Sequence, residues 1–312
     1  MAQLGVAGLS ASHAGRGRAD CFELPRRHQY TPGSPRARSL VRRDRRQRHG
    51  EPDLAQGEER LGRLERPLTG GGADRAADLD GTVVRVRLDR KATSISLLVV
   101  LGVRADGQKV LLAIKSMGGE SAEAWRSVLE DLVKRGLRRP EFLIVDGAPG
   151  LDKAIAAVWD GVPVQRCTVH KHRNLLAHAP ERLHEEITAD YSDMIYAMTC
   201  EEIAARRKAF IRKWRLKHRA VADSLEEAGE RLFAFTRLPP SQWKSARTTN
   251  AIERLHEEFK RRIKTQTVLP SADTAAMLFW ALLASGQINM RKVDGWQTLA
   301  TKPIDQPIDL AA

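Results

Sequence analysis

The stretch Phe142-Leu-Ile-Val-Asp-Gly-Ala-Pro-Gly-Leu151 indicates the fold of this chain. Four apolar residues lead into Asp146, and two glycines and a proline follow within four positions. A run this short, bounded by turn residues, is typical of a buried strand. A carboxylate at the point where such a strand meets its loop lies at the sheet edge where open α/β folds build their sites. The same residues also allow a simpler interpretation, in which Asp146 caps the next helix or shapes the turn.

Periodicity on either side of this stretch predicts the rest of the sheet. Val84 and Val86 alternate with arginines, as in a half-exposed strand, and Asp106-Gly107 is a hairpin signal. The predicted elements are strands at 78–87, 94–103 and 109–115, a helix at 120–135, a strand at 142–145, a helix at 151–159 and a strand at 162–165. A meander followed by helix crossovers gives a mixed sheet, and this order is that of an RNase H-like α/β fold, in which the first strand lies beside the fourth.

Composition divides the chain into five parts. Residues 1–75 are rich in arginine and poor in hydrophobic periodicity, so we expect them to be disordered or loosely helical. This segment is either a basic arm that grips DNA or a remnant with no evolved role. Residues 76–166 contain the strands of the core, residues 167–240 have helical patterns throughout, residues 241–300 complete the core, and residues 301–312 form a tail.

The totals limit the function classes. The chain has 312 residues and a formal net charge of +13, an excess that predicts a polyanionic partner, most often nucleic acid. Three cysteines give no disulfide framework and suit a reducing cytoplasm. The apolar runs are far shorter than the roughly 20 residues of a membrane helix, and the N-terminus lacks a signal-peptide pattern. We therefore expect a cytoplasmic protein without a membrane partner.

A second carboxylate, Asp80, lies in the first predicted strand, on the same face as Val84 and Val86. Asp78 is a rival on that face, and Asp80 is preferred for its position within the strand. If the first strand lies beside the fourth, Asp80 approaches Asp146. Two converging carboxylates are a natural site for Mg²⁺, which takes oxygen ligands.

Glu253 is the third candidate and lies near the start of a predicted helix. It follows Asn250 by three residues, the spacing of a capping box, which is the alternative interpretation. Cations surround it, as a site for phosphodiesters requires, because acids hold metal while cations hold phosphate. A solvated helix face is the alternative for these cations. The residues predicted to contact DNA are Arg247, Arg254, Arg261, Arg262 and Lys264.

Cys167 and His170 form a Cys-x-x-His pair just after the last predicted strand. With His172 nearby, the pair could begin a zinc site, but no second pair at finger spacing follows. We expect a role near the active site or in packing, with metal binding as a minor option. His170 is the better functional candidate, and Cys167 is expected to be buried.

Several segments, in this order, resemble the Mutator-type transposases of bacterial insertion sequences. The resemblance covers roughly residues 79 to 300, and its most specific parts are the last two segments. The segments are Asp80-Gly, Leu101-Gly-Val-Arg-Ala-Asp-Gly107, Trp125 with Leu132-Val-Lys-Arg-Gly136, Val145-Asp-Gly-Ala-Pro-Gly-Leu151, Gln165-Arg-Cys-Thr-Val-His170 with Arg173-Asn174, and Arg247-Thr-Thr-Asn-Ala-Ile-Glu253.

The resemblance implies a DNA transposase with an RNase H-like domain and a helical insertion between the last strand and the helix that carries the glutamate. It implies that Asp80, Asp146 and Glu253 are a catalytic DDE triad that binds Mg²⁺ or Mn²⁺. It also implies DNA partners, namely the element's terminal inverted repeats and target DNA, and a homo-oligomer at the nucleoid. Relatives usually carry a longer helical region before the first aspartate. Three alternatives stay open: a degenerate remnant that binds DNA without transposing, an RNase H-like nuclease, and a metal-free DNA-binding regulator.

Overall fold

The computed structural model of the protein describes residues 76–88, 91–119, 121–263, 271–305 and 308. The expectations for residues 1–75 lie outside this part of the chain. The strands are β1 Ala76–Leu88, β2 Lys91–Val103, β3 Lys109–Met117, β4 Phe142–Val145 and β5 Val164–Arg166. The α-helices are α2 Ala122–Lys134, α3 Pro149–Val158, α4 Thr168–Ala177, α5 His184–Ile195, α6 Cys200–Lys217, α7 Arg219–Ala228, α8 Trp243–Ala246, α9 Asn250–Ile263 and α10 Ala272–Ala284. Short 3₁₀ helices are η2 Glu181–Leu183, η3 Gly229–Arg237, η4 Pro240–Gln242 and η5 Trp296–Thr298.

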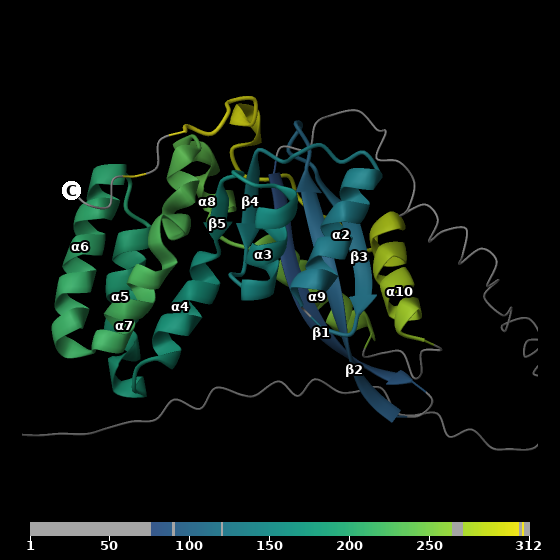
Figure 1. Ribbon diagram of the computed structural model, residues 1–312, viewed down its shortest axis with the longest axis horizontal. Coiled ribbons are helices and arrows are strands. Elements are labelled where there is room, and N and C mark those ends of the chain that lie inside the picture. The colour runs from purple at the N-terminus through teal and green to yellow at the C-terminus, as the bar shows by residue number, and fades with distance from the viewer. Residues whose placement is uncertain (1–75, 89–90, 120, 264–270, 306–307, 309–312) are drawn as a thin grey trace, which may run out of the picture. The chain divides into compact units, whose positions relative to one another are not determined.

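The strands form one mixed sheet in the order β3-β2-β1-β4-β5 (Figure 1). β1, β2 and β3 are antiparallel, whereas β4 is parallel to both β1 and β5. A tight turn joins β2 to β3, where Gly107 has a φ of 82° and its N–H donates to the carbonyl of Arg104 at 2.8 Å. Parallel pairs need crossover connections, which α2 and α3 provide. The prediction that the first strand lies beside the fourth is confirmed.

Helices cover both faces of the sheet (Figure 1). Leu98 and Val100 of β2 pack with α2 and α3 on one face. Leu97 and Val99 pack with α9 and α10 on the other. Because side chains alternate along a strand, the continuous apolar run of β2 contributes to two cores at once.

The helical region, residues 168–246, has its own core beside the β5 edge of the sheet (Figure 1). Trp214 and Phe233 are fully buried there. Gln165 of β5 ties the sheet to this region, because its Nε2 donates to the carbonyl of Leu232 at 2.8 Å and its Oε1 accepts from the N–H of Phe235 at 2.7 Å. One buried side chain thereby extends the hydrogen bonding of the edge strand. Over the residues given above, no helix has the length and apolar character needed to span a bilayer.

Candidate active site

Three parallel strands bring the candidate residues to one edge of the sheet. The register pairs Leu79 with Val145 and Val145 with Arg166. The N–H that follows β5 donates to the Val145 carbonyl at 2.7 Å, so the ladder continues one position further. The positions that come next on the three strands are Asp80, Asp146 and Cys167. They are called here the strand-end row, because β4 and β5 end immediately before it, whereas β1 continues to Leu88. The backbone of Asp80 is described within β1, but its side chain lies outside the described part.

Asp146 is held by the turn that follows β4. Its Oδ1 accepts a hydrogen bond from the N–H of Ala148 at 2.9 Å, and Gly147 has a φ of 95°. The turn-shaping interpretation of Asp146 is therefore correct, but it uses only one carboxylate oxygen. The side chain is half-buried, and no Lys or Arg side chain in the described ranges forms an ion pair with it. A second oxygen with its negative charge remains available for a ligand.

Arg166 packs directly over this turn. A Cβ added to Gly147 would lie 2.5 Å from the Arg166 Nε, so only glycine allows this close approach. Arg166 Nη1 binds Glu227 Oε2 of α7 at 2.6 Å, and the same oxygen accepts from Lys171 Nζ at 2.9 Å. Lys171 is fully buried and also donates to Ser224 at 3.0 Å. Burial lowers the pKa of Lys171, and the hydrogen bond to Glu227 opposes that shift.

A second ion pair joins the helical region to the start of α3, just after the loop that contains Asp146. Both guanidinium nitrogens of Arg231 in η3 bind the carboxylate of Asp152, at 2.6 and 2.9 Å. Asp152 lies in the first turn of α3, immediately after the loop that contains Asp146. These contacts were not foreseen from the sequence, because nothing local to Arg166 or Asp152 indicates partners in α7 and η3.

Cys167 connects the strand-end row to α9. Its buried Sγ accepts from the N–H and from the Oγ1 of Thr249, both at 3.4 Å. Burial raises the pKa of the Cys167 thiol, but hydrogen bonds with His170 and Thr249 outweigh burial and leave the pKa below its ordinary value. The expectation that Cys167 is buried is confirmed. No cluster of three His, Cys, Asp or Glu side chains able to hold a metal occurs among the side chains that are described.

Glu253 faces α4. Its Oε1 lies 3.3 Å from His170 Nε2 and 3.3 Å from Arg173 Nη1. The capping-box alternative is wrong, because the N–H of Glu253 donates to the carbonyl of Thr249 at 3.0 Å and that of Asn250 to Thr248 Oγ1 at 3.4 Å. His170 thus contacts both Cys167 and Glu253, and its role near the site stays a prediction.

The predicted DNA-contacting cations differ in their surroundings. Arg247 is only 8% exposed, and its Cζ lies 4.7 Å from the ring of Phe235, 5.2 Å from that of Tyr196 and 5.7 Å from that of Trp243. These cation–π contacts disfavour the predicted contact of Arg247 with phosphate. Arg261 and Arg262 both pair with Glu258. Arg254 is exposed. Lys264 lies outside the described residues.

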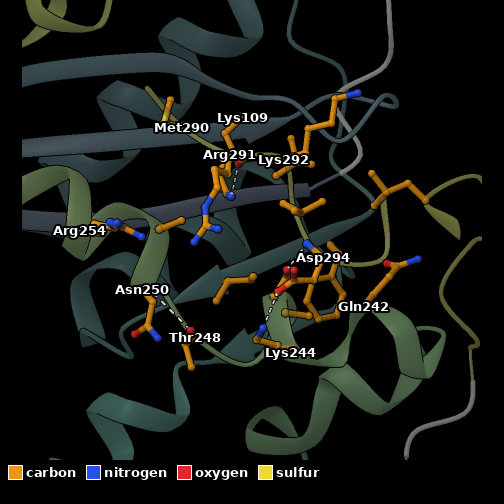
Figure 2. A pocket seen from close by; sticks show the side chains of 18 of the residues that line it. Lys109, Gln242, Lys244, Thr248, Asn250, Arg254, Met290, Arg291, Lys292 and Asp294 are labelled. Atoms are coloured by element: carbon orange, nitrogen blue, oxygen red, sulfur yellow. Dashed lines mark hydrogen bonds and ion pairs between the residues drawn. The ribbon is translucent and has the colours of Figure 1, made fainter. Parts of the chain in front are cut away.

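A cavity of about 650 Å³ lies between β4, α9 and residues 288–294 (Figure 2). Phe142 and Ile144 of β4 form part of its apolar floor. Figure 2 shows Arg254 and Arg291 on one side and Lys244 with Asp294 on another. No local pattern indicates this cavity, since its walls come from segments that are far apart in the chain.

Comparisons with known proteins identify the relatives of this chain. Residues 66–292 match the family described as "Transposase, Mutator family". Among curated relatives, the chain is 32% identical over 216 residues to the "Transposase for insertion sequence element IS6120" of Mycolicibacterium smegmatis, covering 69% of this chain and 66% of the relative. It is 31% identical over 204 residues to the "Transposase for insertion sequence element ISRM5" of Rhizobium meliloti, covering 65% and 51%. The chain spans about half to two thirds of the length of these relatives. With nearly three quarters of its residues in the match, the chain belongs to the Mutator family of transposases.

Proposed function

We propose that the chain is a DDE-type transposase that cuts DNA phosphodiester bonds and transfers the cut strand, using Asp80, Asp146 and Glu253. The observation that supports this proposal is the alignment of Asp80 and Asp146 in the strand-end row. Positions 80 and 146 are level on adjacent parallel strands, and the Cys167–Thr249 contact brings the start of α9 to the same edge. The strand order and the helices between β5 and α9 support an RNase H-like fold.

The donor set fits Mg²⁺ or Mn²⁺, because these ions prefer carboxylate oxygens. When bound, a pair of ions would activate water or a 3′-hydroxyl and stabilise the leaving oxygen. Asp80 and Asp146 would hold the ions, with Glu253 completing the set. The Ala148 N–H fixes one oxygen of Asp146 and so orients the other. His170 and Arg173 hold Glu253 in place from α4.

DNA is the proposed partner, as the terminal inverted repeats of the element and as target DNA. Arg254 and Arg261 are exposed on α9 and would contact phosphates, so binding should weaken as salt rises. Arg262 would contribute less, because Glu258 and the carbonyl of Gln287 already bind it. A homo-oligomer assembled on DNA, acting at the nucleoid in the cytoplasm, completes the proposal.

The test is cleavage of duplexes that carry the inverted repeats flanking the gene, with Mg²⁺ present. Asp146→Asn should lower the rate of strand cleavage roughly 10³-fold or more, while DNA affinity stays within about two-fold. Asp193→Asn is the matched control: Asp193 lies on α5 and pairs with Arg206, so its loss should leave cleavage unchanged. Full cleavage by Asp146→Asn would contradict the mechanism.

The same assay separates the alternatives. Cleavage without strand transfer, and without preference for the repeats, would instead indicate an RNase H-like nuclease. DNA binding by the wild-type chain with no metal-dependent cleavage would indicate a remnant that binds DNA without transposing, or a metal-free regulator.

A further inference from the structure

The cavity in Figure 2 is lined in part by β4, the strand that leads into Asp146. Phe142 and Ile144 both line it, and alternation along the strand places position 146 on the same face, about 7 Å beyond Ile144. Thr248 and Asn250, which also line it, flank Thr249 at the Cys167 contact. The cavity therefore lies on the same face of β4 as the Asp146 position, although none of the three proposed metal ligands lines it.

The cavity has an apolar floor and a cationic rim. Leu255 and Ile288 extend the floor begun by the two β4 residues. Arg254 and Arg291 are exposed, and their guanidinium groups bind no other side chain in the described ranges. Five Lys or Arg residues line the cavity against three acids, one of which, Glu258, already pairs with two arginines.

The wall opposite α9 is fixed in position. Lys109 Nζ donates to the carbonyl of Arg291 at 2.7 Å, and Gln108 Nε2 donates to that of Met290 at 3.2 Å. The N–H of Val293 donates to the carbonyl of Gly107 at 3.0 Å. The β2–β3 hairpin thus holds the segment that presents Arg291, so the cavity is largely preformed, as ligand sites usually are.

We propose that this cavity takes one unstacked nucleotide of the DNA strand whose neighbouring phosphate lies at Asp146, an inference that rests on the proposed function. The base would lie on the floor formed by Phe142 and Ile144, and Arg254 and Arg291 would hold the adjoining phosphate. Enzymes that work on one point of a duplex often turn a nucleotide out of the stack into such a pocket. Apolar and aromatic floors accept any base, because every base has a π-face.

The chain itself is the competing occupant. Ala76, the first described residue, pairs with both Val103 and Phe142, which line the cavity, so a segment of the chain before Ala76 is the other occupant that the experiment must distinguish. The two occupants give opposite results with DNA, because a cavity filled by the protein's own residues cannot take a base.

The experiment uses the full chain, with EDTA present, and duplexes that carry 2-aminopurine at successive positions through the inverted repeat. Wild type should give a fluorescence increase at one position near the cleavage point. Arg254→Ala/Arg291→Ala should abolish this increase and weaken DNA binding about ten-fold by anisotropy. Met290→Trp, which fills the cavity without removing charge, should abolish the increase with affinity changed less than about three-fold. Arg212→Ala, an exposed arginine of α6, should preserve both readouts.

A fluorescence increase at no single position, or one that survives both cavity variants, would overturn the inference. Circular dichroism and the melting temperature establish that each variant is folded. Because the measurement excludes metal, it does not depend on cleavage. If the chain cleaves DNA but no base enters the cavity, only the nucleotide proposal is contradicted. If a base enters the cavity but no metal-dependent cleavage occurs, only the proposed function is contradicted.

Discussion

Carboxylates of the helical region and the Asp146 carboxylate at the end of the sheet have different binding partners. In the helical region, five acids each lie within 2.9 Å of a lysine or arginine nitrogen, and they are Glu186, Asp190, Asp193, Glu226 and Glu227. At the sheet end, Asp146 binds a backbone N–H and no described cation. An acid that already binds a cation stabilises the fold, whereas Asp146 has no described cation partner and leaves one oxygen open to a ligand. Asp146 differs in this from the third proposed ligand, Glu253, which pairs with Arg173 of α4.

The two regions also bury ionisable groups differently. Lys171 of the helical region is fully buried beside Glu227. His256 of α9 is buried on the sheet side, and burial, with a smaller contribution from Lys260, lowers its pKa to about 3. The helical region pairs its buried charge, while the sheet side keeps its buried ring neutral. Lowering the pH should therefore destabilise the sheet side through His256, whereas removing Glu227 should destabilise the helical region through Lys171.

The largest expected effect concerns His256. Its folded pKa of about 3 lies below the unfolded value near 6.5, so between these pH values only the unfolded chain binds the proton. The free energy of unfolding should fall as pH drops from 6.5 to 3, by up to about 5 kcal/mol from this residue alone. Urea titrations across that range should show a shallower fall for His256→Gln. The exposed His178→Gln should follow wild type, and parallel curves for all three proteins would contradict the prediction.

A smaller loss is expected when Lys171 loses its partner. Glu227→Gln should lower the free energy of unfolding by about 1–3 kcal/mol, less than for a fully buried pair because Glu227 is 62% exposed. Lys171→Met combined with Glu227→Gln should recover part of this loss, since the fully buried charge of Lys171 is then removed, although Arg166 still lacks its partner. Removing the exposed Arg126–Glu130 pair by Arg126→Ala is the control and should cost less than about 0.5 kcal/mol. Equal losses in the single and double variants would show that the buried charge is not responsible.

A substitution of Gly147 tests whether Arg166, which Glu227 of the helical region binds, shapes the turn of Asp146. Gly147→Ala places a methyl group against Arg166 at a positive φ, so we expect a loss of about 1–2 kcal/mol. The Mg²⁺-dependent cleavage rate should fall more than stability explains, by roughly ten-fold, because the carboxylate shifts with the turn. Gly118→Ala, where a Cβ meets nothing within 4 Å, is the matched control. Unchanged cleavage in Gly147→Ala would indicate a turn that tolerates displacement.

The smallest effect is expected for an acid of the helical region. Asp190 accepts from the indole Nε1 of Trp214 at 2.9 Å and pairs with Lys213 at 2.6 Å. Asp190→Asn should lower the free energy of unfolding by about 1 kcal/mol. Its cleavage rate should stay within two-fold of wild type, in contrast to Asp146→Asn. A large loss of cleavage by Asp190→Asn with normal stability would show that an acid of the helical region is also needed for cleavage, and would contradict the contrast with Asp146.

Much of the fold could be predicted from local patterns. The apolar run before Asp146 is a strand, Asp106-Gly107 is a hairpin turn, and the predicted helix at 120–135 corresponds to α2. Side-chain environments could not be predicted in the same way. Arg247 precedes the helix start like any solvated cation, yet the rings of Tyr196, Phe235 and Trp243 surround its guanidinium. The cavity likewise depends on segments brought together from across the chain.

Local patterns are enough to predict the strands, the turns and the position of Asp146, because these depend on periodicity and backbone preferences over a few residues. Which acids bind a lysine or arginine depends instead on how the sheet and the helices pack. The capping-box alternative for Glu253 is wrong, and its carboxylate instead contacts His170 and Arg173 of α4, the latter 80 positions earlier in the chain. Contacts over such separations depend on how the sheet and helices pack, and no local pattern contains that information.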